Sequence, residues 1–196
     1  DPTNLTLDRY ICEHARSVQP RVCFLPQASG EADAYIVEFY RAFSELDARP
    51  SHLSLFNLPT ADLEAYILEK DVVYVGGGNT KSMLALWREW ELDRILRRAW
   101  DEGVILAGLS AGAICWFEMG TTDSVPGGLS ALPCLGFLDG SASPHYDGES
   151  ERRPAYHRMI RSKEMPPGYG IDDGAALHFV DRDLHKVVST PAGATA

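Results

Sequence analysis

Hydrophobic and polar residues follow one another in blocks that predict helices separated by short strands. Apolar residues recur at helical spacing in residues 5–17, 32–46, 59–67 and 81–100. Short apolar runs, typical of strands buried on both faces, lie at residues 21–26, 52–58, 71–75 and 103–109. The pattern therefore predicts strict alternation of helix and strand through Trp116.

Strict alternation of this kind predicts an α/β fold with a mostly parallel sheet and helices on both of its faces. In such sheets, ligands bind outside the carboxyl ends of the strands. Two glycine-rich corners, at residues 76–78 and 108–112, directly follow predicted strands. We expect both corners to lie at that edge and to form part of a site.

The pattern changes after the second glycine-rich corner. Residues 113–117 can continue as a helix, and residues 118–170 are rich in Gly, Pro, Ser and Asp, with one helical patch at residues 153–162. A long irregular stretch within a compact domain is usually functional, so we expect site residues there. Two short strands at residues 175–180 and 186–190 are predicted to form a hairpin.

Ser110 stands at the predicted strand-to-helix corner with Gly108 two residues before it and Gly112 two residues after it. This Gly-x-Ser-x-Gly pattern is typical of a nucleophile elbow, where a sharp turn lifts the serine hydroxyl above the sheet. Neighbours crowding such a turn must lack a β-carbon. The alternative is that Ser110 merely caps a helix.

A serine nucleophile needs a base, and six histidines compete for that role. His145 stands in Ser-Pro-His-Tyr, where the proline restricts the backbone and an aromatic residue follows, as suits a positioned base. The others are expected to be structural, solvated or part of the terminal hairpin: His14, His52, His157, His178 and His185.

The glycine-rich corner at residues 76–78 lacks the spacing of a dinucleotide loop and the Lys-Ser/Thr of a phosphate loop. As an oxyanion hole, Gly77 or Gly78 would let a backbone amide approach the substrate carbonyl, together with the amide of Ala111. A purely structural turn is the competing interpretation. The orienting acid is ambiguous, because Asp123, Asp172 and Asp173 all lie in turn-like segments and aspartates there are often turn formers.

Composition narrows the classes of function. The 196 residues suffice for one domain, and a net charge of −10 disfavours binding to nucleic acid or to anionic membranes. No apolar run reaches membrane-spanning length. The four cysteines lack metal-ligand spacing, and free, mostly buried thiols in a reducing cytoplasm are expected. They are Cys12, Cys23, Cys115 and Cys134.

Five segments together resemble the peptidase E group of serine peptidases, which includes aspartyl dipeptidases and is related to cyanophycinases. They are residues 75–80 (VGGGNT), 108–113 (GLSAGA), 121–123 (TTD), 143–146 (SPHY) and 170–174 (GIDDG). The resemblance implies a single domain over residues 1–196 with a flavodoxin-like three-layer sandwich, similar to the glutamine amidotransferases. Compared with that family, terminal strands are expected to be missing from the sequence given.

The resemblance also implies roles for individual residues. Ser110 would be the nucleophile, His145 the general base, and Gly77 or Gly78 with Ala111 the oxyanion hole. Asp173 is the preferred third member of the triad, with Asp123 as the alternative. If the family usually has Glu at the position of Asp173, its carboxyl is one methylene shorter here, and the contact to the histidine must be re-formed by backbone adjustment.

The implied function is a cytoplasmic serine-type exopeptidase that hydrolyses short peptides, similar to dipeptidase E and requiring no metal or cofactor. A homodimer is considered as its assembly. A preference for Asp-X peptides would need a cation, for which Arg152, Arg153, Arg158 and Arg161 are available. The alternative is a homologue with weak or absent peptidase activity that acts as a binding or regulatory protein. An esterase is a third interpretation.

Overall fold

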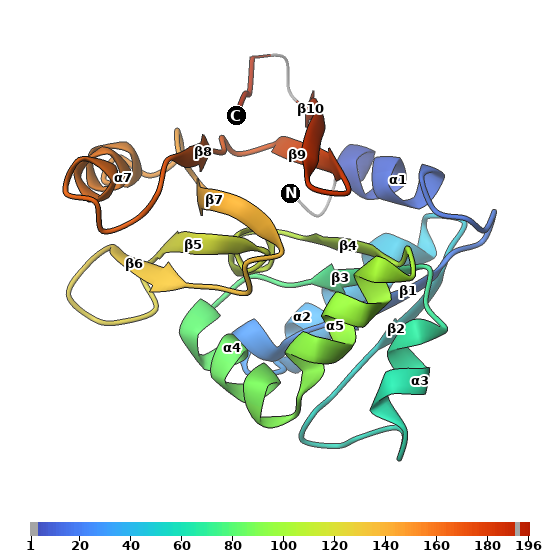
Figure 1. The fold of residues 1–196 in the computed structure, drawn as a ribbon. Helices are drawn as coiled ribbons and strands as arrows, with labels where there is room; N and C mark the ends of the chain where they lie inside the picture. Colours follow the sequence, from blue (N-terminus) through green and yellow to red (C-terminus); the bar gives the residue numbers. More distant parts are fainter. Residues whose placement is uncertain (1–3, 191–192) are drawn as a thin grey trace. The chain divides into compact units, whose positions relative to one another are not determined.

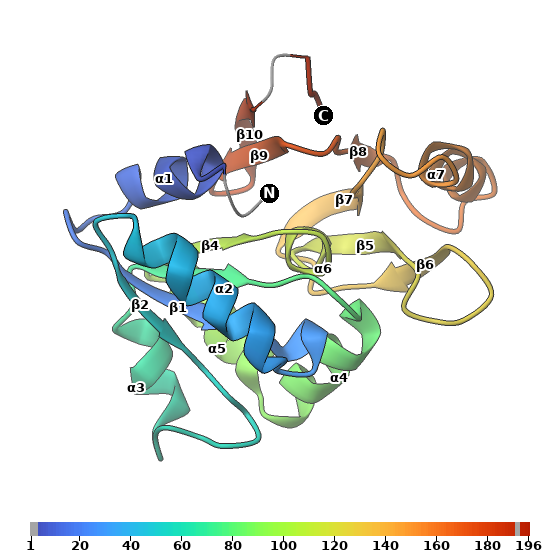
Figure 2. The same ribbon diagram turned by 180° about the vertical axis from the view of Figure 1, so that it is seen from behind.

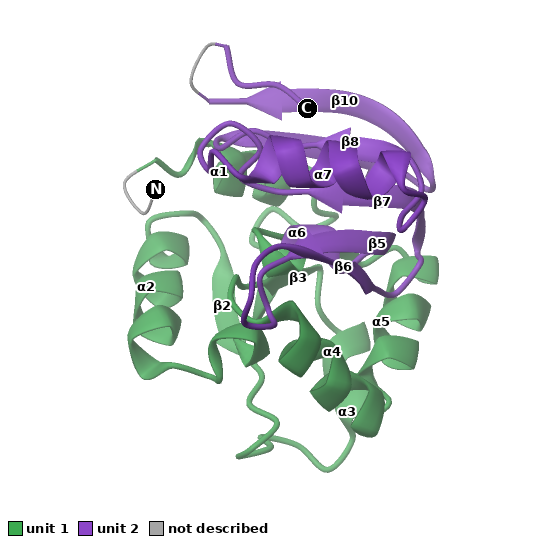
Figure 3. Ribbon diagram, turned by 90° about the vertical axis from the view of Figure 1, so that its left-hand side faces the viewer, with its two compact units in different colours: residues 1–112 green, residues 113–196 purple. Residues whose placement is uncertain are grey.

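The computed structural model describes residues 4–190 and 193–196, so the expectations that fall on residues 1–3 and 191–192 lie outside the described residues. The chain divides into two compact units, Asp1–Gly112 and Ala113–Ala196 (Figure 3). The expectation of a single domain over residues 1–196 stays a prediction.

Unit 1 contains a four-stranded parallel sheet in the order β2-β1-β3-β4 (Figure 1). The strands are β1 (Arg21–Leu25), β2 (Arg49–His52), β3 (Val72–Val75) and β4 (Ile105–Gly108). The helices are α1 (Thr6–Glu13), α2 (Asp33–Ser44), α3 (Leu63–Leu68), α4 (Thr80–Glu89) and α5 (Leu92–Asp101), with a 3₁₀ turn, η1, at Gln27–Ser29. The predicted alternation of helix and strand is confirmed.

Helices cover both faces of the sheet in unit 1, as Figures 1 and 2 show from opposite sides. On one face, α1 and α2 pack on an aromatic cluster in which Phe24 of β1 stacks on Phe39 of α2 with ring centroids 4.6 Å apart. On the other face, α3, α4 and α5 bury Ile67, Trp87 and Leu96 completely. This layering is flavodoxin-like and directs the carboxyl ends of the strands to one edge.

Two predictions for unit 1 are wrong in detail. The second strand is β2, not residues 52–58, and it contains Pro50. Proline is tolerated there because β2 is an edge strand of the sheet. The predicted helix over residues 81–100 is two helices, because Glu91 adopts a φ of 54° that a continuous helix cannot accommodate. After this turn, α5 buries Leu92 completely.

Unit 2 contains a second, mixed sheet in the order β6-β5-β7-β8 and a separate antiparallel hairpin. Its elements are β5 (Phe117–Thr122), β6 (Ser130–Pro133), β7 (Leu138–Ser143), α7 (Arg152–Arg161), β8 (Gly168–Gly170), β9 (Ala175–Val180) and β10 (Asp183–Ser189). The predicted hairpin and the helical patch are confirmed. The prediction of loops over the remainder of residues 118–170 is wrong, and α6 (Ala111–Ile114) ends before Phe117, which starts a strand.

The strands of unit 2 were not predicted because, beyond Phe117 and Leu138, small and polar residues fill most of the buried positions of β5 and β7. Ser141 of β7 is completely buried. The Ser141 hydroxyl lies 2.8 Å from the Tyr156 hydroxyl and donates to the Pro166 carbonyl at 2.6 Å. Buried hydroxyls with partners of this kind can replace apolar residues in a strand. Composition alone does not reveal such partners.

None of the helices in the described part of the chain has the length and hydropathy needed to cross a membrane. Of the cysteines, Cys23 and Cys115 are buried, as their apolar surroundings predicted. Burial raises the pKa of the Cys23 thiol to about 12, so this thiol stays protonated at neutral pH.

We predict that Asp8→Asn stabilises the protein near neutral pH. Asp8 lies in α1, accepts a hydrogen bond from Tyr74, and has its pKa raised by burial. A carboxyl whose pKa is higher in the folded state costs stability above that pKa, and the cost disappears as the pH falls below it. The melting temperature should therefore rise by about 1–3 °C at pH 8 and by less at pH 4.

Differential scanning fluorimetry of both proteins across this pH range measures the effect. Asp33→Asn is the matched control, because Asp33 is exposed in the first turn of α2 and should give no gain. An equal gain at pH 4 and pH 8 would contradict the assignment to the Asp8 charge.

Candidate functional site

Ser110 occupies the corner between β4 and α6 with a φ of 53°, in the left-handed region that residues other than glycine seldom adopt. Steric crowding explains why glycines stand two residues before and two residues after Ser110. A β-carbon on Gly112 would lie 2.2 Å from the Val75 carbonyl oxygen, and one on Gly108 would lie 2.5 Å from the Gly112 carbonyl oxygen. The corner thus has the backbone of a nucleophile elbow, with Ala111 as the residue that follows the serine.

The glycine-rich corner after β3 lies directly beside this elbow within unit 1. A β-carbon added to Gly77 would meet the Ser110 β-carbon at 3.3 Å and the Leu109 side chain at 3.1 Å. The corner and the serine therefore lie in close contact, and a β-carbon at Gly77 would require its neighbours to shift by a few tenths of an ångström. Unit 1 brings together two of the features that the sequence placed at the sheet edge.

The hydrogen bonds of the corner distinguish Gly78 from Gly77. The Gly77 amide donates to the Tyr35 hydroxyl at 3.1 Å, and the Asn79 amide donates to the Ala28 carbonyl at 2.7 Å. Gly78 is an exposed residue, and within residues 4–190 and 193–196 no group accepts a hydrogen bond from its amide. The geometry therefore favours Gly78 over Gly77 as the amide that can donate to a bound ligand.

In unit 2, the His145 ring is paired with Asp173. The two residues follow β7 and β8, which are neighbouring parallel strands, and His145 Nδ1 lies 2.7 Å from Asp173 Oδ1. A carboxylate only accepts hydrogen bonds, so Nδ1 carries the proton and Nε2 is the basic nitrogen of the ring. The aspartate carboxyl reaches the ring without the additional methylene of a glutamate. His145 has a φ of 53°, a strained conformation shared with Ser110.

The loop after His145 holds the Asp173 segment in place. The Asp173 amide donates to Asp147 Oδ1 at 2.8 Å, and this hydrogen bond lowers the pKa of the Asp147 carboxyl. Gly148 passes so close that a β-carbon there would lie 2.2 Å from Asp173 Oδ2. Asp123, the alternative acid, is exposed just after β5. The structure therefore pairs His145 with the preferred carboxylate.

A cluster next to His145 was missed by sequence analysis. The Tyr146 hydroxyl lies 2.8 Å from His157 Nε2, and the Arg153 guanidinium stacks over the Tyr146 ring at 4.6 Å from its centroid. His157 is exposed, as predicted. The one available signal was the aromatic residue directly after His145, which gave no indication of which α7 side chains would contact it.

The four candidate arginines differ in their surroundings. Arg152 is buried, and its guanidinium donates to Glu149 at 2.6 Å and to the Thr121 carbonyl at 3.1 Å. These contacts commit Arg152 to the fold of unit 2. Arg153 is exposed beside Tyr146, and Arg158 and Arg161 are exposed farther along α7. Arg153 is therefore the arginine that lies next to the His145 segment.

The remaining histidines have local partners elsewhere. His14 Nδ1 lies 2.8 Å from the Tyr10 carbonyl oxygen, and His52 Nδ1 lies 2.9 Å from the Tyr40 hydroxyl. His178 and His185 face each other across the terminal hairpin, with ring centroids 5.2 Å apart. Among the described residues, no group of three or more His, Cys, Asp or Glu side chains could hold a metal ion.

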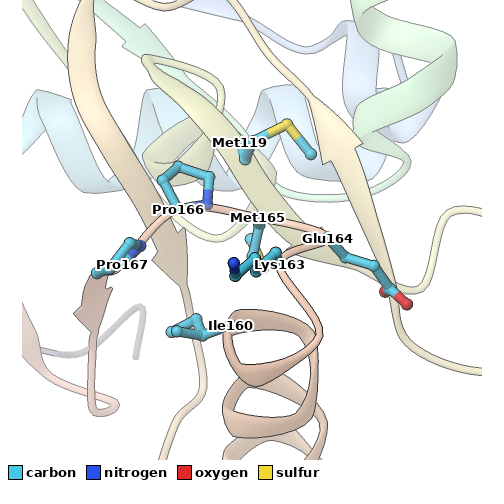
Figure 4. Close-up of a pocket in the computed structure, with 7 residues that line it drawn as sticks. All are labelled: Met119, Ile160, Lys163, Glu164, Met165, Pro166 and Pro167. Atoms are coloured by element: carbon cyan, nitrogen blue, oxygen red, sulfur yellow. The ribbon is translucent and has the colours of Figure 1, made fainter.

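Unit 2 also contains a cavity of about 440 Å³ with a mostly apolar lining (Figure 4). It is formed by residues from β5, from the end of α7 and from the segment before β8, including Met119, Ile160, Met165 and Pro166. None of the site residues predicted from the sequence lines this cavity. The predicted residues themselves fall into two sets, with Ser110 and the glycine-rich corner in unit 1 and His145 and Asp173 in unit 2.

Sequence comparisons assign the chain to a family. The model of Peptidase family S51 matches residues 1–187. The chain is 58% identical over 196 residues to the "Uncharacterized peptidase YgaJ" of Bacillus subtilis (strain 168), covering 100% of this chain and 85% of that protein. It is 28% identical to Peptidase E of Pasteurella multocida (strain Pm70) over 172 residues, which are 81% of this chain and 70% of that protein.

Among solved structures, the chain is similar to a Listeria monocytogenes EGD-e protein provisionally named a peptidase E. The TM-score is 0.72 at 19% identity, and the match covers 93% of this chain and 92% of the other. At this identity the match supports the fold alone, and the shared fold confirms the predicted α/β class. The family model and the relatives confirm the resemblance to peptidase E, and the chain belongs to peptidase family S51.

Proposed function

We propose that this peptidase is a serine-type exopeptidase that hydrolyses short peptides in the manner of dipeptidase E. Ser110 is the nucleophile, His145 the general base and Asp173 the orienting acid. The observation that carries the proposal is the 2.7 Å contact between His145 Nδ1 and Asp173 Oδ1, which leaves Nε2 as the base. Membership of a peptidase family and the strained elbow at Ser110 support the same assignment.

In the proposed mechanism, His145 Nε2 removes the proton of the Ser110 hydroxyl as its oxygen attacks the scissile carbonyl carbon. The negative charge that develops on the carbonyl oxygen accepts hydrogen bonds from the backbone amides of Gly78 and Ala111. The protonated His145 then gives its proton to the leaving amine as the C–N bond breaks, forming an acyl-enzyme. A water molecule, deprotonated by the same nitrogen, attacks the ester carbonyl carbon; the bond to the Ser110 oxygen then breaks, His145 returns the proton to that oxygen, and the acid product leaves.

For the substrate, we propose short peptides with an acidic residue, cleaved as Asp-X dipeptides. Recognition of a carboxylate side chain calls for a cation, and an arginine binds it with two parallel hydrogen bonds. Arg153 supports this preference because it is exposed and stacked on the tyrosine that follows His145. The substrate carboxylate would accept hydrogen bonds from the edge of the Arg153 guanidinium, while the face of the guanidinium stays stacked on the Tyr146 ring.

We predict that Ser110→Ala abolishes turnover in a panel of dipeptides that includes Asp-X sequences. Removing the nucleophile of a triad lowers kcat by about 10⁴–10⁶-fold. Initial rates of amine release, measured on wild type and variant at equal concentration, test this. Activity that survives in the variant would rule out the proposed nucleophile, and turnover of esters without turnover of peptides would indicate an esterase.

Replacing each candidate acid in turn with asparagine shows which of the two orients His145. Asp173→Asn should lower kcat by about 10⁴-fold, because an amide cannot stabilise the imidazolium or hold the productive tautomer of His145. Asp123→Asn serves as the matched control and should stay within twofold of wild type. Steady-state kinetics with the best dipeptide give both values, and the reverse order of effects would assign the acid to Asp123.

A steric test uses Gly148. Gly148→Ala places a methyl carbon 2.2 Å from Asp173 Oδ2, so the carboxyl that contacts His145 must shift. We expect kcat to fall by about 10–100-fold with little change in thermal stability, because displacements of this size disturb catalytic geometry. Ser150→Ala is the control, because Ser150 is exposed in the same loop and its substitution adds no β-carbon. Equal kinetics of the two variants would contradict the role of Asp173.

A further inference from the structure

The Tyr35 side chain is held rigidly under the glycine-rich corner of unit 1. Tyr35 lies in the first turn of α2, and its ring meets the Phe24 ring edge-on with centroids 5.2 Å apart. A β-carbon on Gly76 would come within 3.0 Å of both rings. The ring therefore has little room to move, and its hydroxyl accepts the Gly77 amide from a fixed position.

The other side of the corner is fixed by the 3₁₀ turn after β1. Asn79 donates its amide to the Ala28 carbonyl, and Gly78 approaches the same carbonyl so closely that a β-carbon would lie 2.2 Å from its oxygen. Gln27 anchors this turn, because its side chain donates to the Leu53 carbonyl at 2.7 Å and is itself buried. The peptide of Gly78 is thus held between two anchored neighbours.

Gly78 itself has a φ of +133°, which glycine adopts easily and other residues do not. A glycine with this freedom would let the peptide rotate unless its neighbours held it. Two hydrogen bonds restrain it: the Tyr35 hydroxyl accepts from the Gly77 amide, and the Ala28 backbone carbonyl accepts from the Asn79 backbone amide. Burial raises the pKa of Tyr35, so the hydroxyl is neutral at physiological pH and remains able to accept.

From this arrangement we infer that Tyr35 is a positioning residue for the oxyanion hole, aiming the Gly78 amide by engaging the Gly77 amide. The inference rests on the proposed function of Ser110 and deepens it. It also explains why the two adjacent glycine amides differ in role. The Gly77 amide donates to the Tyr35 hydroxyl, and the Gly78 amide remains available to a substrate oxygen. Preorganised donors stabilise a transition state because they need not reorganise during the reaction.

Tyr35→Phe keeps the ring and removes only the acceptor, and it is the test. We expect kcat to fall about 10–30-fold with KM within twofold of wild type, because the oxyanion forms only on the way to the transition state. Tyr40→Phe is the matched control on the same helix. The bond it loses is the one to the His52 ring and not one to the glycine-rich corner, so it should keep wild-type kinetics.

Two further readouts separate positioning from general loss of structure. A peptidyl boronic acid forms a tetrahedral adduct with a serine nucleophile, so its inhibition constant should rise in Tyr35→Phe by the same factor as kcat falls. Binding of the product amino acids should not change. Hydrogen exchange of the Gly77 amide, followed by NMR, should accelerate in Tyr35→Phe and not in Tyr40→Phe.

The outcomes distinguish this inference from the proposed function. If Ser110→Ala abolishes activity while Tyr35→Phe has the kcat and boronate affinity of Tyr40→Phe, the positioning role is overturned and the serine mechanism stands. If wild type shows no Ser110-dependent turnover, the proposed function fails. In that case, unchanged exchange of the Gly77 amide in Tyr35→Phe would overturn the restraint itself.

Discussion

The close approach between the elbow and the end of β3 is the constraint on which the Ser110 part of the proposed site depends. Gly112 packs against the Val75 carbonyl at a distance that leaves no space for a side chain. Because β3 and β4 are neighbouring parallel strands, their carboxyl ends deliver the glycine-rich corner and Ser110 to the same place. The contact between Gly77 and Ser110 follows directly from this packing.

Strain at both ends of the proposed proton relay is supported by the surrounding packing. Ser110 and His145 each have a φ of 53°, and residues in this conformation persist only where neighbouring structure holds them. In unit 1, the two flanking glycines fit against strand backbone. In unit 2, the hydrogen bonds of Asp173 with His145 and Asp147 connect the loops after β7 and β8. These contacts offset the cost of the unfavourable backbone conformation.

Polar interactions are concentrated where the two parts of the proposed site are built. In unit 2, Ser141, Arg152 and Tyr156 form buried hydrogen bonds beside an apolar cluster that includes Met159 and Met165. In unit 1, Gln27 and Tyr35 order the loops above an aromatic cluster. Buried hydrogen bonds are directional, so they fix loop geometry more sharply than apolar contacts do. Loss of one partner destabilises the fold, because the other partner is then buried without a hydrogen bond.

The sequence by itself determined the α/β alternation, three strands of the parallel sheet, the terminal hairpin and the local features of the elbow at Ser110, because these depend on periodicity and on glycines close in the chain. Only the tertiary structure decided that Asp173 pairs with His145 and that Tyr35 engages Gly77, contacts that span 28 and 42 positions. It also decided the polar strands of unit 2 and the edge strand with Pro50. Partners so distant in sequence leave no local pattern, since the fold alone brings them within hydrogen-bonding distance.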